Sequence, residues 1–350
     1  MVTATVVAAA RMAESADAEA SKVFTREGVW VRVPLRARCY RCSMSSATPF
    51  QENAVALFPG QGSIASGAGL AWRESAHWGI IAKISEVANT DVATLLLDAP
   101  TEVIVRTDNA QIATFALSMI GYLDLLERGV RPRYHLGHSL GEFTSLVASG
   151  LISLEDGARL ISVRGAAMAR AATECEGSMV ALLGGDDQAR AALADLDGVW
   201  VANINGTEQI VVSGTTQGLQ VLVEKAREFG WRRATALPVG GAFHSPLMAP
   251  AQEALDQALS RVQWGTTEVV HIANVDGRIH ANSGDWSNLL SRQLTSPIEF
   301  VDATLALPPA VTTSIEMPPA GVLTGLTKRI REFPQQVALS SLTDLQELTL

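Results

Sequence analysis

Apolar residues along the body of the chain alternate between strand-length and helix-length segments. From Ala54, the segment AVALFPGQGS predicts a buried strand that runs into a glycine-rich loop. Residues 108–129 carry apolar positions at helical spacing and end at a glycine, which predicts a helix. RPRYHLGHS (131–139) predicts a short strand and a turn, and LGEFTSLVASGLIS (140–153) predicts the following helix. Strands that alternate with helices indicate a largely parallel sheet covered on both faces.

The pattern changes between about residues 177 and 240. It predicts a strand, a helix, two strands joined at Gly206 and Thr207, a second helix and a final strand. This β-α-β-β-α-β order is typical of a ferredoxin-like unit. We therefore expect a ferredoxin-like small subdomain at residues 173–240, inserted into a large α/β subdomain formed by residues 51–172 and 241–350.

The large subdomain is expected to resume after the inserted unit with alternating elements. The expected helices, strands and terminal helix are, in order, helix 249–262, strand 267–275, helix 286–294, strand 311–317 and a terminal helix from Gly321.

The first 50 residues differ in composition from the rest. They carry seven Lys and Arg against four Asp and Glu, and their alanine-rich start lacks the basic and apolar regions of a secretory signal. We expect residues 1–50 to be a poorly ordered extension. Cys39 and Cys42 have the spacing of zinc ligands, but no second Cys or His pair stands nearby, so we expect no bound metal.

Charge and composition narrow the classes of partner. The net charge of −9 argues against general nucleic-acid binding, which requires a basic surface. No apolar run reaches the roughly 18 residues that span a bilayer, so no membrane insertion is expected. The chain has only three cysteines, too few for a disulfide framework, which favours a reducing cytoplasmic location.

Residues 137–141, GHSLG, fit the G-x-S-x-G pattern of a nucleophile elbow. A tight strand-to-helix turn of this kind, found in α/β-hydrolase-like folds, raises the Ser139 hydroxyl above the sheet. The amide of Leu140 then lies at a helix N-terminus, where it can stabilise an oxyanion. An incidental serine in an ordinary turn is the alternative interpretation.

A serine nucleophile requires a base, and six histidines are available. His244, in VGGAFHSPLMAP, follows a predicted strand and two glycines, so a loop can present its imidazole beside the site. We prefer His244 as the base. The other histidines, assigned to packing, strand, loop or elbow-bracing positions, are His77, His135, His138, His271 and His280.

Seven segments in fixed order suggest a family. They are FPGQGS (58–63), TDNAQIA (107–113), GHSLGEF (137–143), SVRGAAM (162–168), VANINGTEQIVVSG (201–214), GAFHSPLM (241–248) and VLTGLTKR (322–329). Together they resemble the malonyl-CoA:acyl-carrier-protein transacylases, including the free-standing acyltransferases that serve polyketide synthases. The resemblance covers about residues 54–330.

This resemblance implies a ping-pong acyl transfer from malonyl-CoA to the phosphopantetheine thiol of an acyl carrier protein. Ser139 would be the nucleophile and His244 the general base and acid. The family's oxyanion hole maps onto the amides of Gln61 and Leu140, and a backbone carbonyl at Gln293 would orient the histidine. The resemblance also implies a monomer that needs no cofactor and no metal.

Two further positions bear on the acyl group. Family members that take dicarboxylic acyl groups have an arginine where this chain has Arg164, and its guanidinium can clamp the free malonyl carboxylate. The alternative is a solvated helix arginine. Phe243 lies in the segment GAFHS, which malonyl-selective relatives share, and it would limit the room for a branch at the α-carbon of the acyl group. A substituted malonyl group is the alternative substrate.

The chain departs from the family at Pro318-Pro319-Ala320, where relatives carry a Gly-Pro-Gly turn, so a different loop geometry is expected there. Basic residues suggest where an acidic carrier protein docks. The first candidate edge is Lys328, Arg329 and Arg331, and the second is Arg232 and Arg233. A solvated charged face is the alternative for both.

Other functions are compatible with parts of this pattern. One is an acyl-thioester hydrolase that edits carrier proteins with the same Ser-His dyad, and another is a non-catalytic docking protein. A general esterase would need a triad acid, and its candidates Asp186, Asp187, Asp195 and Asp197 all fall in the small subdomain. The sequence does not distinguish a fatty-acid enzyme from one of a polyketide pathway, nor does it name the carrier protein.

Overall fold

The computed structural model describes residues 22–24, 30–32, 49–206, 208–280 and 283–348. The chain divides into two compact units, residues 1–45 and residues 46–350. In the first unit, β1 (Lys22–Phe24) pairs antiparallel with β2 (Trp30–Arg32). Most of the expected extension 1–50, including Cys39 and Cys42, lies outside the described residues, so the expectations for it stay predictions.

A six-stranded sheet lies at the centre of the second unit, with strand order β10-β9-β4-β3-β11-β12. All its neighbouring strands pair in parallel except β10 with β9. The strands are β3 (Gln51–Phe58), β4 (Pro132–Gly137), β9 (Val270–Ile272), β10 (Ile279–His280), β11 (Thr313–Glu316) and β12 (Gln335–Ala338). Residues 54–58 of β3, residues 135–137 of β4 and all four residues of β11 are buried, as expected for strands inside a sheet with helices on both faces. The fold is the expected α/β-hydrolase-like arrangement.

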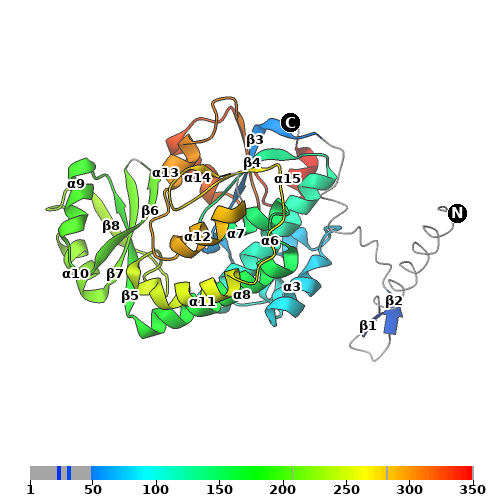
Figure 1. Ribbon diagram of the computed structural model, residues 1–350, viewed down its shortest axis with the longest axis horizontal. Coiled ribbons are helices and arrows are strands. Elements are labelled where there is room, and N and C mark those ends of the chain that lie inside the picture. Colours follow the sequence, from blue (N-terminus) through cyan, green and yellow to red (C-terminus); the bar gives the residue numbers. More distant parts are fainter. Residues whose placement is uncertain (1–21, 25–29, 33–48, 207, 281–282, 349–350) are drawn as a thin grey trace. The chain divides into compact units, whose positions relative to one another are not determined.

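Helices cover this sheet, and two of them have 21 residues each: α6 (Thr107–Glu127) and α8 (Leu154–Glu174). Figure 1 shows α8 and α11 running along one side of the unit. The other helices of the large subdomain are α3 (Ile80–Ala88), α4 (Val92–Leu97), α5 (Thr101–Ile104), α7 (Leu140–Ala148), α11 (Ala249–Leu259), α12 (Ser283–Gln293), α13 (Phe300–Leu305), α14 (Val322–Ile330) and α15 (Leu342–Glu347). Within the part of the chain that the structure describes, every helix is too short or too polar to cross a bilayer.

The expectation of a terminal helix from Gly321 was wrong in one respect. The helix forms as α14, but the chain then continues into β12, which pairs with β11, and into α15. The strand was missed because its four residues, QQVA, are half-buried and only two of them are apolar, so they show no apolar run.

A second sheet of four antiparallel strands has the order β6-β7-β5-β8 and lies at one end of the unit with α9 and α10 (Figure 1). This strand order and the connecting helices are those of a ferredoxin-like unit. Its elements are β5 (Gly177–Leu183), α9 (Asp187–Ala191), β6 (Val199–Gly206), β7 (Gln209–Thr215), α10 (Thr216–Glu224) and β8 (Arg233–Ala236). The subdomain boundaries at 172 and 241 stay predictions.

The small sheet is joined to the large subdomain beside the end of β4. The amides of Ile204 and Ile298 donate to the carbonyls of Ile298 and Ala202, each at 2.9 Å. His138, next to the elbow serine, makes a 2.9 Å hydrogen bond between its Nε2 and Oδ1 of Asn205 in β6. His138 therefore couples the elbow to the small subdomain, in agreement with its expected bracing position.

The unusual Pro318-Pro319-Ala320 segment is fixed at several points. The Ser118 hydroxyl of α6 donates to the Pro318 carbonyl at 2.5 Å. The buried Glu316 carboxylate accepts from the amides of Gly321 and Leu323, both at 2.8 Å, at the start of α14. A carboxylate at a helix N-terminus satisfies amides that have no partner within the helix.

Candidate active site

Ser139 occupies a strained turn between β4 and α7. Its φ of 53° and ψ of −107° lie in a region that residues with a side chain rarely adopt. Any Cβ at Gly137 would collide with the backbone at Gly141 and Glu142, and one at Gly141 would collide with the carbonyl of Phe58. The two glycines of the pattern are thus required by the close approach of three backbone segments.

Hydrogen bonds from two side chains hold the strained peptide in place. The Ser139 amide donates to Oδ1 of Asn274 at 2.7 Å, and Nε2 of Gln293 donates to the Ser139 carbonyl at 3.0 Å. Both supports are tied to the buried Glu142: its Oε1 accepts from the Asn274 amide at 2.8 Å, and its Oε2 accepts from Nε2 of Gln293. Both backbone groups of Ser139 are thereby fixed through one carboxylate.

His244 lies against the serine hydroxyl. Its Nε2 is 2.8 Å from Oγ of Ser139, and its Nδ1 is 2.8 Å from the carbonyl of Gln293. A carbonyl only accepts, so Nδ1 carries a proton and Nε2 is left to accept the hydroxyl proton. Burial, with Arg164 nearby, lowers the pKa of His244 to about 3, which keeps the imidazole neutral at physiological pH. The pair has the geometry of a nucleophile and its general base.

Arg164 of α8 lies beside this pair and is fully buried. One Nη donates to Oγ of Ser139 at 3.1 Å and to Oε1 of Gln293 at 3.0 Å, and the other donates to Oε1 of Gln111 at 2.7 Å. These partners are uncharged, and the Arg164 Nε has no hydrogen-bond partner among the described residues. Burial lowers the Arg164 pKa to about 9, so the guanidinium stays protonated at neutral pH. A buried cation held by neutral acceptors can accommodate an anion.

Other expected site residues lie around the elbow. Gln61 begins the short 3₁₀ helix Gln61–Ser63 after β3, and the His138 amide donates to the Phe58 carbonyl at 3.0 Å, so this loop adjoins the elbow. Leu140 is the first residue of α7, which places its amide at the helix N-terminus. Phe243 is buried immediately before His244. The oxyanion roles of Gln61 and Leu140 and the selectivity role of Phe243 stay predictions.

A second serine–histidine pair is present but differs from this one. His271 Nδ1 is 3.4 Å from Oγ of Ser145, whose hydroxyl donates to the Glu142 carbonyl at 2.8 Å. His271 Nε2 lies 2.9 Å from the Ser149 hydroxyl. Both ring nitrogens thus lie near buried serine hydroxyls, and His271 lies in β9, in agreement with its expected strand position.

Sequence reasoning missed Glu142, Asn274 and Gln111 as parts of the site. Gln111 lies in the TDNAQIA segment, but without a structure nothing indicated that it accepts from Arg164. Glu142 did carry a signal: every residue of α7 is buried, and Glu142 is its one charged residue. An ionisable side chain in an otherwise buried helix requires partners, and it is often functional.

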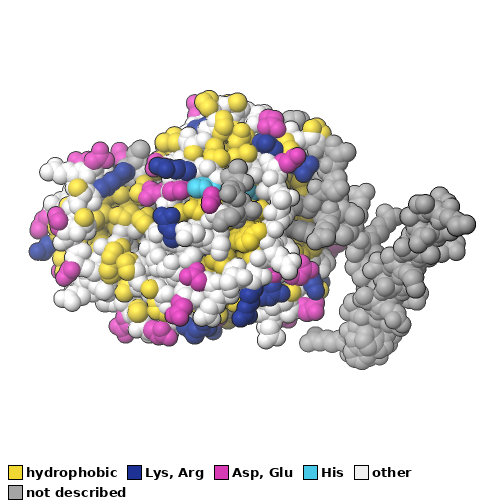
Figure 2. Space-filling model, in the orientation of Figure 1, with side chains coloured by type: hydrophobic (Ala, Val, Ile, Leu, Met, Phe, Trp, Pro, Cys, Tyr) yellow, Lys and Arg dark blue, Asp and Glu magenta, His cyan; other side chains and the backbone are white. Residues whose placement is uncertain are grey.

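The structure gives Arg331, one of the residues expected to dock the carrier protein, a different role. Arg331 donates to the carbonyls of Leu307, Pro308 and Val311 at 2.6–2.7 Å, so it fastens its loop and is a poor candidate for carrier docking. Lys328 and Arg329 of α14 are exposed. On the face shown in Figure 2, basic and acidic side chains are interspersed, and no large patch of one sign forms there.

Comparison with known proteins identifies the family. The sequence profile of the acyl transferase domain matches residues 55–340. This chain belongs to that family. It is 36% identical over 292 residues to a malonyl CoA-acyl carrier protein transacylase of Bacillus subtilis, covering 81% of this chain and 92% of the relative.

Solved structures of the family agree with the fold. The corresponding transacylase of Mycobacterium tuberculosis superposes with a TM-score of 0.79 and 32% identity, covering 84% of this chain and 98% of that one. A malonyl-transacylase in complex with a type II polyketide synthase acyl-carrier protein gives a TM-score of 0.78 and 29% identity, covering 84% and 98%. The resemblance suggested by the seven segments is thereby confirmed.

Proposed function

We propose that this chain transfers a malonyl group from coenzyme A to the phosphopantetheine thiol of an acyl carrier protein through an acyl-serine intermediate. The observation that carries this proposal is the buried Arg164, which places a cation 3.1 Å from the Ser139 hydroxyl with only uncharged hydrogen-bond partners. A carboxylate on the acyl group would find a charge-assisted, bidentate partner there. The names of the relatives, which act on malonyl-CoA and acyl carrier proteins, support the same substrate class.

In the first half-reaction, His244 Nε2 takes the hydroxyl proton while Oγ of Ser139 attacks the thioester carbonyl carbon. The negative charge that develops on the carbonyl oxygen would be stabilised by the amides of Leu140 and Gln61. The tetrahedral intermediate collapses as the carbon–sulfur bond breaks. His244 returns its proton to the departing thiolate, leaving coenzyme A and malonyl-Ser139.

The second half-reaction reverses these roles. The phosphopantetheine thiol gives its proton to His244, and its sulfur attacks the malonyl-serine carbonyl. The ester bond to Oγ breaks, and Ser139 recovers the proton from His244. The Gln293 carbonyl, 2.8 Å from Nδ1, stabilises the imidazolium that exists between these steps, so a triad carboxylate is not required.

Arg164 accounts for selection of a dicarboxylic acyl group. An acetyl group would leave the buried guanidinium with an unfilled position at Nε, whereas the free malonyl carboxylate would fill it. No catalytic step in this scheme requires a cofactor or a metal. The expectations of a monomer and of a cytoplasmic location stay predictions, and light scattering on the purified protein tests the first.

Intact-protein mass spectrometry tests the proposal. Incubation with malonyl-CoA should add the mass of one malonyl group to the wild-type protein and none to Ser139→Ala, and acetyl-CoA should label poorly. Addition of holo carrier protein should move the label to the carrier. An acyl-enzyme that hydrolyses rapidly without carrier would instead indicate the editing hydrolase, and absence of any label would indicate a non-catalytic protein.

A further inference from the structure

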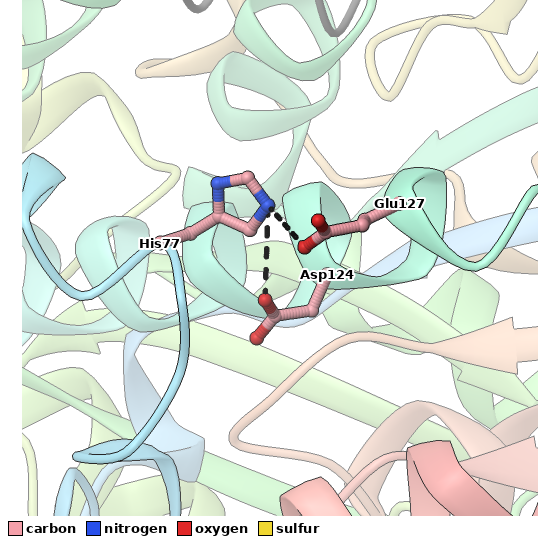
Figure 3. Close-up of side chains that lie close together, drawn as sticks. All are labelled: His77, Asp124 and Glu127. Carbon is pink, nitrogen blue, oxygen red and sulfur yellow. Dashed lines mark ion pairs between the residues drawn. The ribbon is translucent and has the colours of Figure 1, made fainter. Parts of the chain in front are cut away.

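His77, Asp124 and Glu127 form a cluster apart from the active site (Figure 3). His77 lies in the turn before α3, and its amide donates to the Ser75 hydroxyl at 2.9 Å. Asp124 and Glu127 are three residues apart on the last turn of α6, so they share one face of the helix. Figure 3 shows the imidazole of His77 directed toward both carboxylates.

The distances within this cluster fit a tetrahedral metal ion. His77 Nε2 lies 3.3 Å from Oε2 of Glu127 and 3.8 Å from Oδ1 of Asp124. One potential ligand atom from each residue falls within 4.8 Å of the others. Zinc–nitrogen and zinc–oxygen bonds of about 2.0–2.2 Å place tetrahedral ligand atoms about 3.3–3.5 Å apart. Small side-chain adjustments would therefore complete a three-ligand site.

One buried atom in the cluster is unsatisfied. Asp124 Oδ2 is inaccessible to solvent and has no hydrogen-bond partner among the described residues, whereas His77 Nε2 forms ion pairs with Glu127 and Asp124. Asp124 as a whole is only 5% exposed. Its burial raises the pKa of its carboxyl, an effect that the Ser75 hydroxyl and His77 partly offset. A buried polar atom without a hydrogen-bond partner is uncommon and costly, so the Asp124 oxygen is a position where a bound group would be favourable.

We propose that His77, Asp124 and Glu127 bind one Zn²⁺ ion, with water as the fourth ligand. An imidazole nitrogen with two carboxylate oxygens suits zinc, whereas magnesium and calcium prefer all-oxygen sites. The side chain of Glu127 is 45% exposed and leaves an entry route for the ion and its water. The ion would tie the turn before α3 to the end of α6.

This site is distinct from the acyl-transfer site. Asp124 follows Gln111, which contacts Arg164, by thirteen residues on the same helix, or about 20 Å along its axis. Zinc bound here would stabilise the fold without touching the acyl group. The proposal departs from the expectation, drawn from the sequence, that the protein binds no metal.

Zinc binding to chelator-stripped protein tests the proposal. Cys39 and Cys42 have zinc-ligand spacing, so the measurement uses the full chain with both cysteines replaced by serine. Equilibrium dialysis followed by elemental analysis should find one zinc per chain. In His77→Ala and Glu127→Gln the affinity should fall by about tenfold or more, because a ligand is lost.

His280→Ala is the matched control. His280 is another half-buried histidine paired with a carboxylate, since its Nε2 lies 2.9 Å from Oδ2 of Asp276, but no third ligand joins them among the residues that the structure describes. This variant should bind zinc as the parent protein does. Zinc should also raise the unfolding temperature of the parent but not that of Glu127→Gln. Because the Glu127 side chain is 45% exposed, this variant should still fold. The proposal would be overturned if the parent did not bind zinc, or if His77→Ala and Glu127→Gln bound it as tightly as the parent. Malonyl transfer should persist in zinc-free protein.

Discussion

Replacement of Glu142 by glutamine tests how the nucleophile is held. The Glu142 carboxylate accepts one hydrogen bond from the Asn274 amide and one from the Gln293 side chain, and these two residues hold the Ser139 amide and carbonyl. A carboxamide offers a single acceptor oxygen, and its NH₂ group would face one of the two donors. The variant keeps the size of the side chain but leaves a buried donor without an acceptor.

The expected magnitude follows from that lost acceptor. A buried donor without a partner costs about 1–3 kcal/mol. If the whole cost falls on the geometry of Ser139 in the transition state, kcat falls by roughly 5- to 150-fold at pH 8. Glu142 contacts neither reacting atom in the structure, so it is a positioning residue rather than a catalytic one.

The pH dependence of stability provides a second, independent readout. Burial raises the pKa of Glu142 from 4.5 to about 7, and the Asn274 amide, Gln293 and Arg164 oppose this rise. Between these two values the folded protein retains a proton that the unfolded chain has released. The contribution of Glu142 to the free energy of unfolding should therefore decrease by about 3 kcal/mol as the pH rises from about 4.5 to about 7, and it is measured as the difference between wild type and Glu142→Gln at each pH.

Urea unfolding at pH 5, 6, 7 and 8 together with steady-state malonyl transfer makes the test. Glu142→Gln should lose this slope and show the lowered kcat. Asp91→Ala is the control: it removes the N-cap of α4, whose carboxylate accepts from the Thr94 amide at 3.0 Å, and should cost about 1 kcal/mol without changing kcat. A folded Glu142→Gln protein with wild-type kcat and an unchanged slope would refute the positioning role.

Five further substitutions have defined outcomes. Arg164→Ala should lower kcat/KM for malonyl-CoA by about a hundredfold or more and reduce the preference over acetyl-CoA; an unchanged preference would exclude the clamp. Gly141→Ala forces a Cβ into the backbone carbonyl of Phe58 at the end of β3 and should destabilise the fold by about 3 kcal/mol in urea unfolding. Arg331→Ala removes three hydrogen bonds to carbonyls and should cost about 2–3 kcal/mol, whereas Arg329→Ala should stay within about 0.5 kcal/mol. Lys328→Glu should raise the KM for carrier protein and flatten its salt dependence, and an unchanged KM would dismiss α14 as the docking edge.

Local signals in the sequence were sufficient for much of the fold. The period of the apolar residues identified α6 as a helix within two residues of its ends, and the β-α-β-β-α-β order identified the small sheet. Short or polar elements gave no such signal. The four-residue strand β12 is an example, because its pairing with β11 depends on a neighbour that the chain reaches only after α14.

The candidate site also combines residues that the sequence identified with residues whose role only the structure showed. The sequence by itself determined the elbow, since two glycines around Ser139 are required wherever a strand turns this sharply into a helix, and ordered motifs singled out His244 and Arg164. Tertiary structure alone decided that Glu142 holds both supports of Ser139, that Arg331 fastens a loop, and that His77 meets two carboxylates of α6. Backbone conformation is encoded by neighbouring residues, whereas partners of a buried charge come from segments far apart in the chain, and only the packing of the folded protein brings these together.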